Sequence, residues 1–192
     1  MAKKKVAKSA AVTDTWQRIE LWLREHAQPL AQSLAKGASG DQVRKLEATL
    51  RVTLPQEFKD SLAIHDGQKE DCDLIPDEGI GGFFMLRSKE IMRDWKDWNA
   101  VQTAGDFDEA KAVPDKGIAN AWWNNGWIPF ASNGGGDHLC LDLSPAKGGN
   151  VGQIIRIRHD DPARTLMATS FGAWFHALAD TIENGGIDYL IQ

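Results

Sequence analysis

The chain has 192 residues, of which 42% are hydrophobic and 26% are charged, and it carries eight tryptophans and seven phenylalanines. A chain of this length and composition can bury the core of one domain, which argues against disorder throughout. No apolar run approaches the roughly 18 residues that span a bilayer, so we expect no membrane anchor and a cytoplasmic location.

The chain begins with a basic segment, residues 1–12, that contains four lysines. No apolar stretch follows that could form the core of a signal peptide, so we expect a disordered, solvated tail. The net charge is -5, and removing these four positive charges leaves -9 for the rest of the chain. Because an acidic domain repels a phosphate backbone, the sequence predicts a basic protein partner and no direct contact with nucleic acid.

Apolar residues at helical spacing predict a first helix over residues 16–27, behind a cap at Thr13 or Asp14. Pro29 is expected to break or bend this helix. The apolar side is formed by Trp16, Ile19, Trp22 and Leu23.

Two further helices are predicted from their first residues. Ser39 and Gln42 have the spacing of a capping box. Pro55 suits the first turn of a third helix, which Gly67 is expected to end. Its inner side is predicted to consist of Phe58, Leu62 and Ala63.

The pattern changes after the glycines at residues 81–82. Residues 83–86 read as a strand, and residues 91–98 return to helical spacing with Ser88 as a possible cap. Residues 99–121 are irregular and rich in Gly, Asp, Lys and Pro, so we predict a surface insertion there.

An antiparallel meander is predicted next, because apolar strands are joined by turns rich in Asn, Gly and Pro. Its strands are residues 127–131, 138–143 and 152–158. A last helix is expected to begin near Ser170 and to end at residues 185–186. Helices followed by a meander and a closing helix indicate an α+β fold in one domain over residues 13–192.

Three segments carry a family resemblance. LPQEFKDSLAIHDGQ (residues 54–68) closely resembles a signature of the SMI1/KNR4 family, also called SUKH. WIPFASNGGGD (residues 127–137) is similar to a second block of the same family. The third match is a Trp-rich helix, residues 16–23, paired with residues 37–39. Together these matches extend from about residue 14 to residue 176.

The resemblance implies N-terminal helices packed on a twisted, mainly antiparallel sheet with a closing C-terminal helix, used mainly for protein binding. Many bacterial members resemble immunity proteins that neutralise secreted toxins, often nucleases. Fungal members regulate cell-wall assembly through partner proteins. Neither catalysis nor a cofactor is implied. The insertion and an acidic segment at residues 70–73 depart from the leanest family pattern.

The motif at residues 65–68 has two interpretations. Gly67 can supply the positive φ of a helix end, where Asp66 and Gln68 bond local backbone groups. Alternatively, Asp66 and Gln68 lie on a rim and hydrogen-bond a partner. The residues to which the motifs assign a structural role are Leu54, Pro55, His65, Gly67, Trp127, Pro129, Gly134, Gly135, Gly136 and Asp142.

Asn133 and the three glycines after it predict a tight turn between two strands. No helix follows, and Asp137 places a negative charge where a phosphate would lie, so this is not a phosphate-binding loop. Asp142 stands in an apolar strand and requires partners such as turn amides or an arginine, with Arg156 as a candidate.

The remaining reactive residues do not form a recognisable catalytic or metal pattern. Cys72 and Cys140 are too far apart in sequence for a redox pair or a zinc knuckle, and Ser132 lacks a GxSxG setting. Ligand spacing such as HExxH is absent among His138, His159, Asp160 and Asp161. We therefore predict no metal, no cofactor and no enzymatic activity.

Trp122 and Trp123 follow the insertion and are predicted to be partly exposed. They either clamp the insertion to the core or offer a platform on which a sugar ring stacks. The clamp is the simpler interpretation.

The leading prediction is a non-catalytic protein-binding module, an immunity protein that neutralises a basic toxin such as a nuclease. The alternative is a regulator or scaffold of cell-wall (glucan) assembly that acts through protein partners, and a third possibility is a carbohydrate-binding domain. No oligomeric state is predicted. Candidate partner-binding residues are Asp66, Gln68, Glu70, Asp71, Asp73, Asp77, Glu78, Trp122, Trp123, Asn133 and Asp137. The acids at 106, 108 and 109 are further candidates for the acidic surface.

Overall fold

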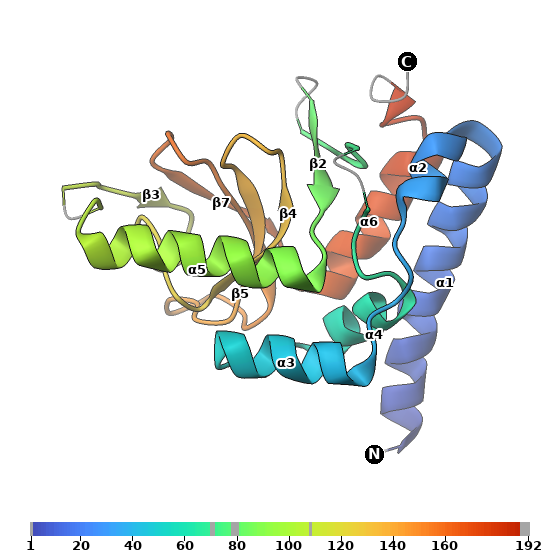
Figure 1. Ribbon diagram of the computed structural model, residues 1–192, viewed down its shortest axis with the longest axis horizontal. Coiled ribbons are helices and arrows are strands. Elements are labelled where there is room, and N and C mark those ends of the chain that lie inside the picture. Colours follow the sequence, from blue (N-terminus) through green and yellow to red (C-terminus); the bar gives the residue numbers. More distant parts are fainter. Residues whose placement is uncertain (1, 70–71, 78–80, 108, 189–192) are drawn as a thin grey trace.

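The structure, a computed structural model, describes residues 2–69, 72–77, 81–107 and 109–188, with only the backbone described for residues 2–10. Its helices are α1 (Ala2–His26), α2 (Gln28–Ser33), α3 (Gly40–Leu50), α4 (Gln56–Ile64), α5 (Ser88–Ala104) and α6 (Phe171–Glu183). Its strands are β1 (Ile75–Pro76), β2 (Gly82–Met85), β3 (Val113–Pro114), β4 (Trp127–Ser132), β5 (His138–Asp142), β6 (Gln153–Ile157) and β7 (Ala163–Ala168). This is an α+β fold, as the sequence predicts (Figure 1).

Helix α1 is longer than the sequence predicts. It begins at Ala2, so residues 2–12, which were expected to be a disordered tail, form its first turns, and both predicted cap residues lie inside the helix. Val12 is only 3% exposed and already belongs to the core. Pro29 lies in the first turn of α2, where its missing N–H removes no helical hydrogen bond.

The capping box at the start of α3 is confirmed. The Ser39 hydroxyl accepts the Gln42 N–H at 3.3 Å, and the Gln42 side chain accepts the Ser39 N–H at 2.8 Å. Pro55 precedes α4, and Phe58 on that helix is buried. Ala63 is exposed, so its predicted place on the inner side of the helix is wrong.

Gly67 has the predicted positive φ of 65°, but not as the end of a helix. Helix α4 ends at Ile64, three residues earlier. A Cβ at Gly67 would lie 2.5 Å from the carbonyl oxygen of Leu86, so glycine is required by the close approach of another segment as well as by φ.

The sheet has the strand order β1-β2-β4-β5-β6-β7-β3. Strands β4, β5 and β6 pair antiparallel, which confirms the predicted meander. Strand β7 extends it, and β3 pairs parallel with β7. These two strands were missed, because only Arg164 of β7 is buried and β3 has two residues, too few for a periodic pattern.

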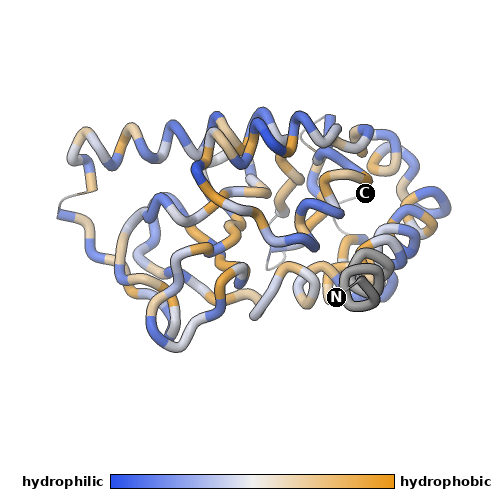
Figure 2. Tube along the Cα trace, turned by 90° about the horizontal axis from the view of Figure 1, so that it is seen from below, coloured by the Kyte–Doolittle hydropathy of each residue, from blue (hydrophilic) through white to orange (hydrophobic). Residues whose placement is uncertain are grey.

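The larger core lies on the face of the sheet that α6 covers, and α1 and α4 pack on α6 from outside (Figure 1). Leu139 and Leu141 of β5 and Ile154 of β6 project into it. In Figure 2, hydrophobic and hydrophilic residues alternate along the helical turns, as expected for helices with one apolar side.

The opposite face of the sheet carries a second core. Cys140, Ile155 and Ile157 of the strands pack there with Ile118 and Trp123. Part of the predicted surface insertion therefore covers this face. Because both faces are covered, every residue of β5 is buried, and its alternation does not identify a solvent side.

Candidate binding site

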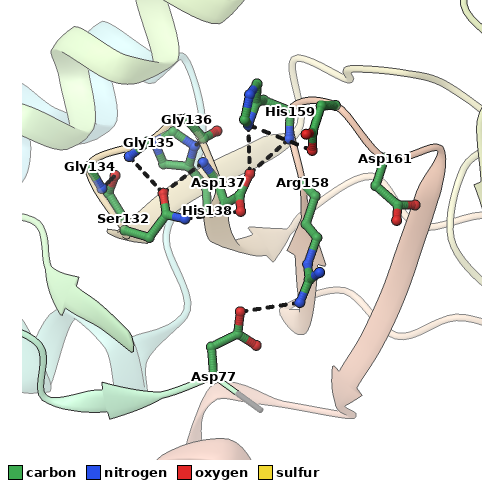
Figure 3. Close-up of polar contacts among 12 residues, drawn as sticks. Asp77, Ser132, Gly134, Gly135, Gly136, Asp137, His138, Arg158, His159 and Asp161 are labelled. Atoms are coloured by element: carbon green, nitrogen blue, oxygen red, sulfur yellow. Dashed lines mark hydrogen bonds and ion pairs between the residues drawn. The ribbon is translucent and has the colours of Figure 1, made fainter. Parts of the chain in front are cut away.

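The turn at residues 133–137, here called the glycine turn, joins β4 to β5 and is held by its own side chains (Figure 3). The Asn133 side-chain oxygen accepts the N–H groups of Gly135 at 2.8 Å and Asp137 at 3.0 Å. The Asn133 amide donates to Asp137 Oδ2 at 3.0 Å. Gly134 and Gly136 have φ values of 74° and 108°. The predicted tight turn is confirmed, and these bonds make it a rigid projection.

Asp137 fastens this turn to the end of β6 (Figure 3). Its Oδ1 accepts the backbone N–H of His159 at 3.0 Å and the ring Nδ1–H at 2.8 Å. Burial raises the pKa of Asp137, but the hydrogen bonds from His159 outweigh it and hold that pKa below its usual range. A Cβ at Gly136 would lie 3.0 Å from His159 Cγ, so the two segments are in close contact.

A metal is not indicated at this contact. Within the described ranges, Asp137, His159 and Asp160 are the one group whose potential ligand atoms lie within 4.8 Å of one another. The His159 Nδ1 already binds Asp137, and Asp160 is exposed. These contacts are those of hydrogen bonds that join the turn to the segment after β6.

A hollow of about 520 Å³, here called the acidic groove, lies between α5 and the turn. Its three carboxylates come from α5 and are those of Glu90, Asp94 and Asp97, and one cation, Arg93, also lines it. Their spacing of four and then three residues places them on one side of the helix. The same spacing is visible in the sequence, but the prediction considered only the apolar side of this helix and therefore missed the carboxylates.

The side chain of Asp94 is tied into the wall of the acidic groove. It accepts hydrogen bonds from His138 Nε2 at 3.1 Å and from Arg93 Nε at 2.8 Å. Burial raises the pKa of Asp94, but the bonds from His138 and Arg93 outweigh it, so the pKa lies below its usual value.

The stability that the Asp94 carboxylate contributes should therefore depend on pH. A lowered folded-state pKa means that this contribution is complete above the unfolded pKa of about 3.9 and is lost as the pH falls through the folded-state value. The difference in unfolding free energy between the wild type and Asp94→Asn is expected to be largest at neutral pH and to shrink below about pH 4. Urea unfolding across this pH range measures it, and a difference that does not vary with pH would contradict the proposed network.

A second hollow, here called the polar cleft, lies on the other side of the turn. It has a volume of about 340 Å³ and brings together four predicted site residues: Asp73, Asp77, Asn133 and Asp137. Asp77 accepts hydrogen bonds from Arg156 at 2.6 Å and Arg158 at 3.3 Å. Burial raises the pKa of Asp73. Glu70, Asp71 and Glu78 lie outside the described residues.

Two predicted partner-binding residues, Asp66 and Gln68, are interior, each 3% exposed. The Asp66 carboxylate accepts the Ser88 N–H at 2.8 Å and its hydroxyl at 3.1 Å, which caps the start of α5. The Gln68 amide donates to Ser33 Oγ and to the Cys72 carbonyl. These contacts favour the structural interpretation of the motif over the rim, but most of the partners are distant in sequence, which the sequence does not reveal.

Of the two tryptophans after the insertion, Trp122 is partly exposed as predicted, whereas Trp123 is buried. Trp123 is 1% exposed and stacks on Trp98 with ring centroids 5.0 Å apart. The guanidinium of the buried Arg164 lies 4.5 Å from the ring centroid of Trp122 and donates to its carbonyl at 2.8 Å. Burial lowers the pKa of Arg164 to about 10. The pair therefore clamps the insertion to the sheet, and Trp123 offers no surface on which a sugar could stack.

The other motif residues support the fold. Asp142 is fully buried, and it accepts hydrogen bonds from Gln153 at 2.8 Å and from the Ser144 N–H at 2.9 Å. Burial raises its pKa. A turn amide, that of Ser144, is thus one of its partners as predicted, whereas the candidate Arg156 pairs with Asp77. The motif residues that are buried are Leu54, Gly67, Trp127, Pro129 and Asp142, whereas His65 is half-buried.

The acidic candidates after α5 are not part of this site. Asp106 and Glu109 lie in the loop after α5, which Figure 1 shows at the far end of that helix from β2. Asp108 lies outside the described residues. Among the acidic candidates in the described ranges, Asp73, Asp77 and Asp137 are the ones that line the polar cleft.

The fold and the site define an α+β domain in which a glycine turn lies between two polar hollows. A model of the SMI1 / KNR4 family (SUKH-1) matches residues 37–177. The chain belongs to this family, which confirms the resemblance seen in the sequence.

Several fungal proteins are similar to almost the whole chain. A cell wall biosynthesis/cell cycle regulator, smi1, of Schizosaccharomyces pombe is 31% identical over 186 residues, covering 91% of this chain and 36% of that protein. A glucan synthesis regulatory protein of Neurospora crassa is 26% identical, covering 91% and 39%. The cell wall assembly regulator SMI1 of Saccharomyces cerevisiae is 22% identical, covering 88% and 40%. This chain thus spans two-fifths or less of the length of these relatives.

Helices that combine the length and apolar character needed to cross a bilayer are not found in the described part of the chain.

Proposed function

We propose that this chain is a non-catalytic protein-binding module that takes part in regulating cell-wall biosynthesis through protein partners. One observation carries this proposal: relatives named as cell-wall or glucan-synthesis regulators are similar to about nine-tenths of the chain. Those names describe regulators and not enzymes. They favour cell-wall regulation, which was the alternative prediction from the sequence, over immunity, which was the leading prediction.

The geometry of the glycine turn supports a binding role. A turn held by Asn133 and Asp137 needs little ordering when a partner docks, which lowers the entropic cost of association. Carboxylates line the acidic groove on one side and the polar cleft on the other. They complement a basic protein surface, whose approach they would accelerate. A cytoplasmic location is part of the proposal and rests on composition.

Immunity is the second candidate function. The acidic groove is the observation that favours it, because the same carboxylates would fit the cationic surface with which a nuclease holds its substrate. A bound immunity protein would block that surface.

Affinity capture from a lysate of the protein's own cells, followed by mass spectrometry, tests both candidates. A site variant, Asp73→Asn with Asp97→Asn, removes one charge from each hollow. The control, Asp106→Asn with Glu109→Gln, removes the same charge from the distant loop. We expect the wild type and the control to retain cell-wall biosynthetic proteins and the site variant to retain several-fold less, by about fivefold or more.

Three results would change the proposal. Recovery of one stoichiometric basic protein that kills cells when expressed alone would establish immunity instead. If both variants lose the same amount of retained protein, the carboxylates near the glycine turn do not form the binding site. Failure to recover any cell-wall protein with the wild type would overturn the regulatory function.

A further inference from the structure

Another groove borders α5 on the side that faces α3, and cations predominate in its lining. It has a volume of about 370 Å³ and is formed between α3 and α5, which run side by side (Figure 1). Its four cations are Lys45, Lys89, Arg93 and Lys96. Asp97 is the one carboxylate in its lining. We call it the basic groove, and it stands out because the chain has a net charge of -5.

The sequence of α5 explains how one helix borders two grooves of opposite sign. Lys89, Arg93 and Lys96 are spaced four and three residues apart, so they form one stripe facing α3. Each is followed directly by an acid, and successive residues of a helix are rotated by about 100°. The carboxylates of Glu90, Asp94 and Asp97 therefore form a second stripe, which lines the acidic groove. The separation is incomplete, because Arg93 and Asp97 line both grooves.

The cations of the basic groove are only partly neutralised. Lys89 lies 3.4 Å from Glu90 and Arg93 lies 2.8 Å from Asp94, its neighbour in sequence. Lys45 and Lys96 form no ion pair with any described residue. Like charges on facing helices repel each other, so the gathering of these cations opposes the packing of α3 on α5. An anionic partner in the groove would relieve this repulsion.

We propose that the basic groove binds an acidic, carboxylate-rich segment of a partner protein in an extended conformation. The cations are spread along the helix, with about 10 Å of axial rise between Lys89 and Lys96. Side chains on one face of an extended chain recur about every 7 Å, so carboxylates at alternate positions can meet successive cations. A single phosphate group would instead require cations that converge on one point. This proposal goes beyond the regulatory function, because it gives the domain a second binding surface for a partner of opposite charge.

A peptide titration tests the proposal on the full chain. The probe is a rhodamine-labelled peptide of about ten residues that alternates glutamate and serine, and the control peptide alternates glutamine and serine. Fluorescence anisotropy reports binding. The groove variant carries Lys45→Gln, Lys89→Gln and Lys96→Gln. A matched variant carries Lys111→Gln, Lys116→Gln and Lys147→Gln, which are exposed lysines outside the groove.

We expect the glutamate peptide to bind the wild type and to bind the groove variant about tenfold more weakly, with a change of less than about twofold in the matched variant. Affinity should also fall when the salt is raised from about 50 to about 200 mM. The glutamine peptide is expected not to bind. Circular dichroism and thermal unfolding of both variants establish that they are folded.

Several results would overturn the proposal. An equal loss of peptide affinity in both variants would show a general charge effect. If the glutamate peptide does not bind the wild type, the basic groove is not a site for acidic segments. Binding of a phosphoserine peptide of the same length, without binding of the glutamate peptide, would make phosphate the ligand. If the wild type sediments as a dimer without peptide and the groove variant as a monomer, the occupant is a second copy of the chain. The capture variant at Asp73 and Asp97 removes the one carboxylate in the lining of the basic groove but keeps its four cations. It should therefore not weaken binding of an acidic segment, and the two proposals can fail separately.

Discussion

Replacing Asp66 with alanine is expected to lower the free energy of unfolding by about 2–4 kcal/mol. The substitution removes the acceptor of two hydrogen bonds, from the backbone N–H and the hydroxyl of Ser88. Both groups belong to the buried first residue of α5, so the substitution leaves two buried donors without their acceptor. Helix α5 also loses the negative charge at its N-terminal end.

Urea unfolding at neutral pH measures this loss, with Asp41→Ala as the matched control. Asp41 also lies in the first turn of a helix, but its side chain is 88% exposed and its described ion pair is with Arg44 on the same helix. We expect the control to change stability by less than about 0.5 kcal/mol. If Asp66→Ala were as mild as the control, Asp66 would not be the cap of α5 and its place on a partner-facing rim would again be open.

Trp123→Ala is expected to cost about 3–5 kcal/mol, because it opens a cavity in the second core. The ring is 1% exposed, stacks on Trp98 and donates from Nε1 to Asn99 Oδ1 at 2.8 Å. It joins the segment after α5 to the sheet, so its loss also loosens the cover over Cys140 and Ile155.

Trp123→Phe is the informative partner variant, because it keeps an aromatic ring and removes the N–H donor. We expect it to cost clearly less than alanine, and denaturant unfolding followed by far-ultraviolet circular dichroism compares the two. Near-wild-type stability of Trp123→Ala, accompanied by loss of glycan binding, would contradict the buried position and favour the sugar platform.

Local patterns in the sequence predicted the parts of the fold that depend on neighbouring residues. The capping box of Ser39 and Gln42 and the cap of α6 at Ser170 each involve residues three positions apart. The meander was readable because its strands are apolar and its turns are rich in glycine. The family resemblance rests on the same local segments.

The misplaced residues depend on contacts between distant segments. Asp66 meets Ser88, which is 22 residues away, and no periodicity in the sequence connects them. Trp123 follows an irregular stretch whose packing against the sheet becomes visible only in three dimensions. Strand β7 carries the buried Arg164 instead of an apolar residue, which hides it from a search for apolar alternation.

The candidate site was predicted in part. Asp73, Asp77, Asn133 and Asp137 come together around the polar cleft, as expected of residues that flank a turn and its neighbouring strand. The acidic groove was not predicted, because the residues of α5 were read only for their apolar side. Its carboxylates line a hollow with residues of the glycine turn, and this arrangement arises only when α5 packs beside the sheet.

The paired charges along α5 also give the domain an electric dipole moment directed across that helix. Lys89 and Lys96 line the basic groove and Glu90 and Asp94 line the acidic groove, so positive and negative charge are partly separated over the width of one helix. A charged partner exerts a torque on such a dipole once it approaches within a few Debye lengths, each about 8 Å at physiological ionic strength. The domain would therefore be turned toward its partner before the two surfaces touch. Raising the ionic strength would weaken this alignment at lower salt than it weakens the direct contacts.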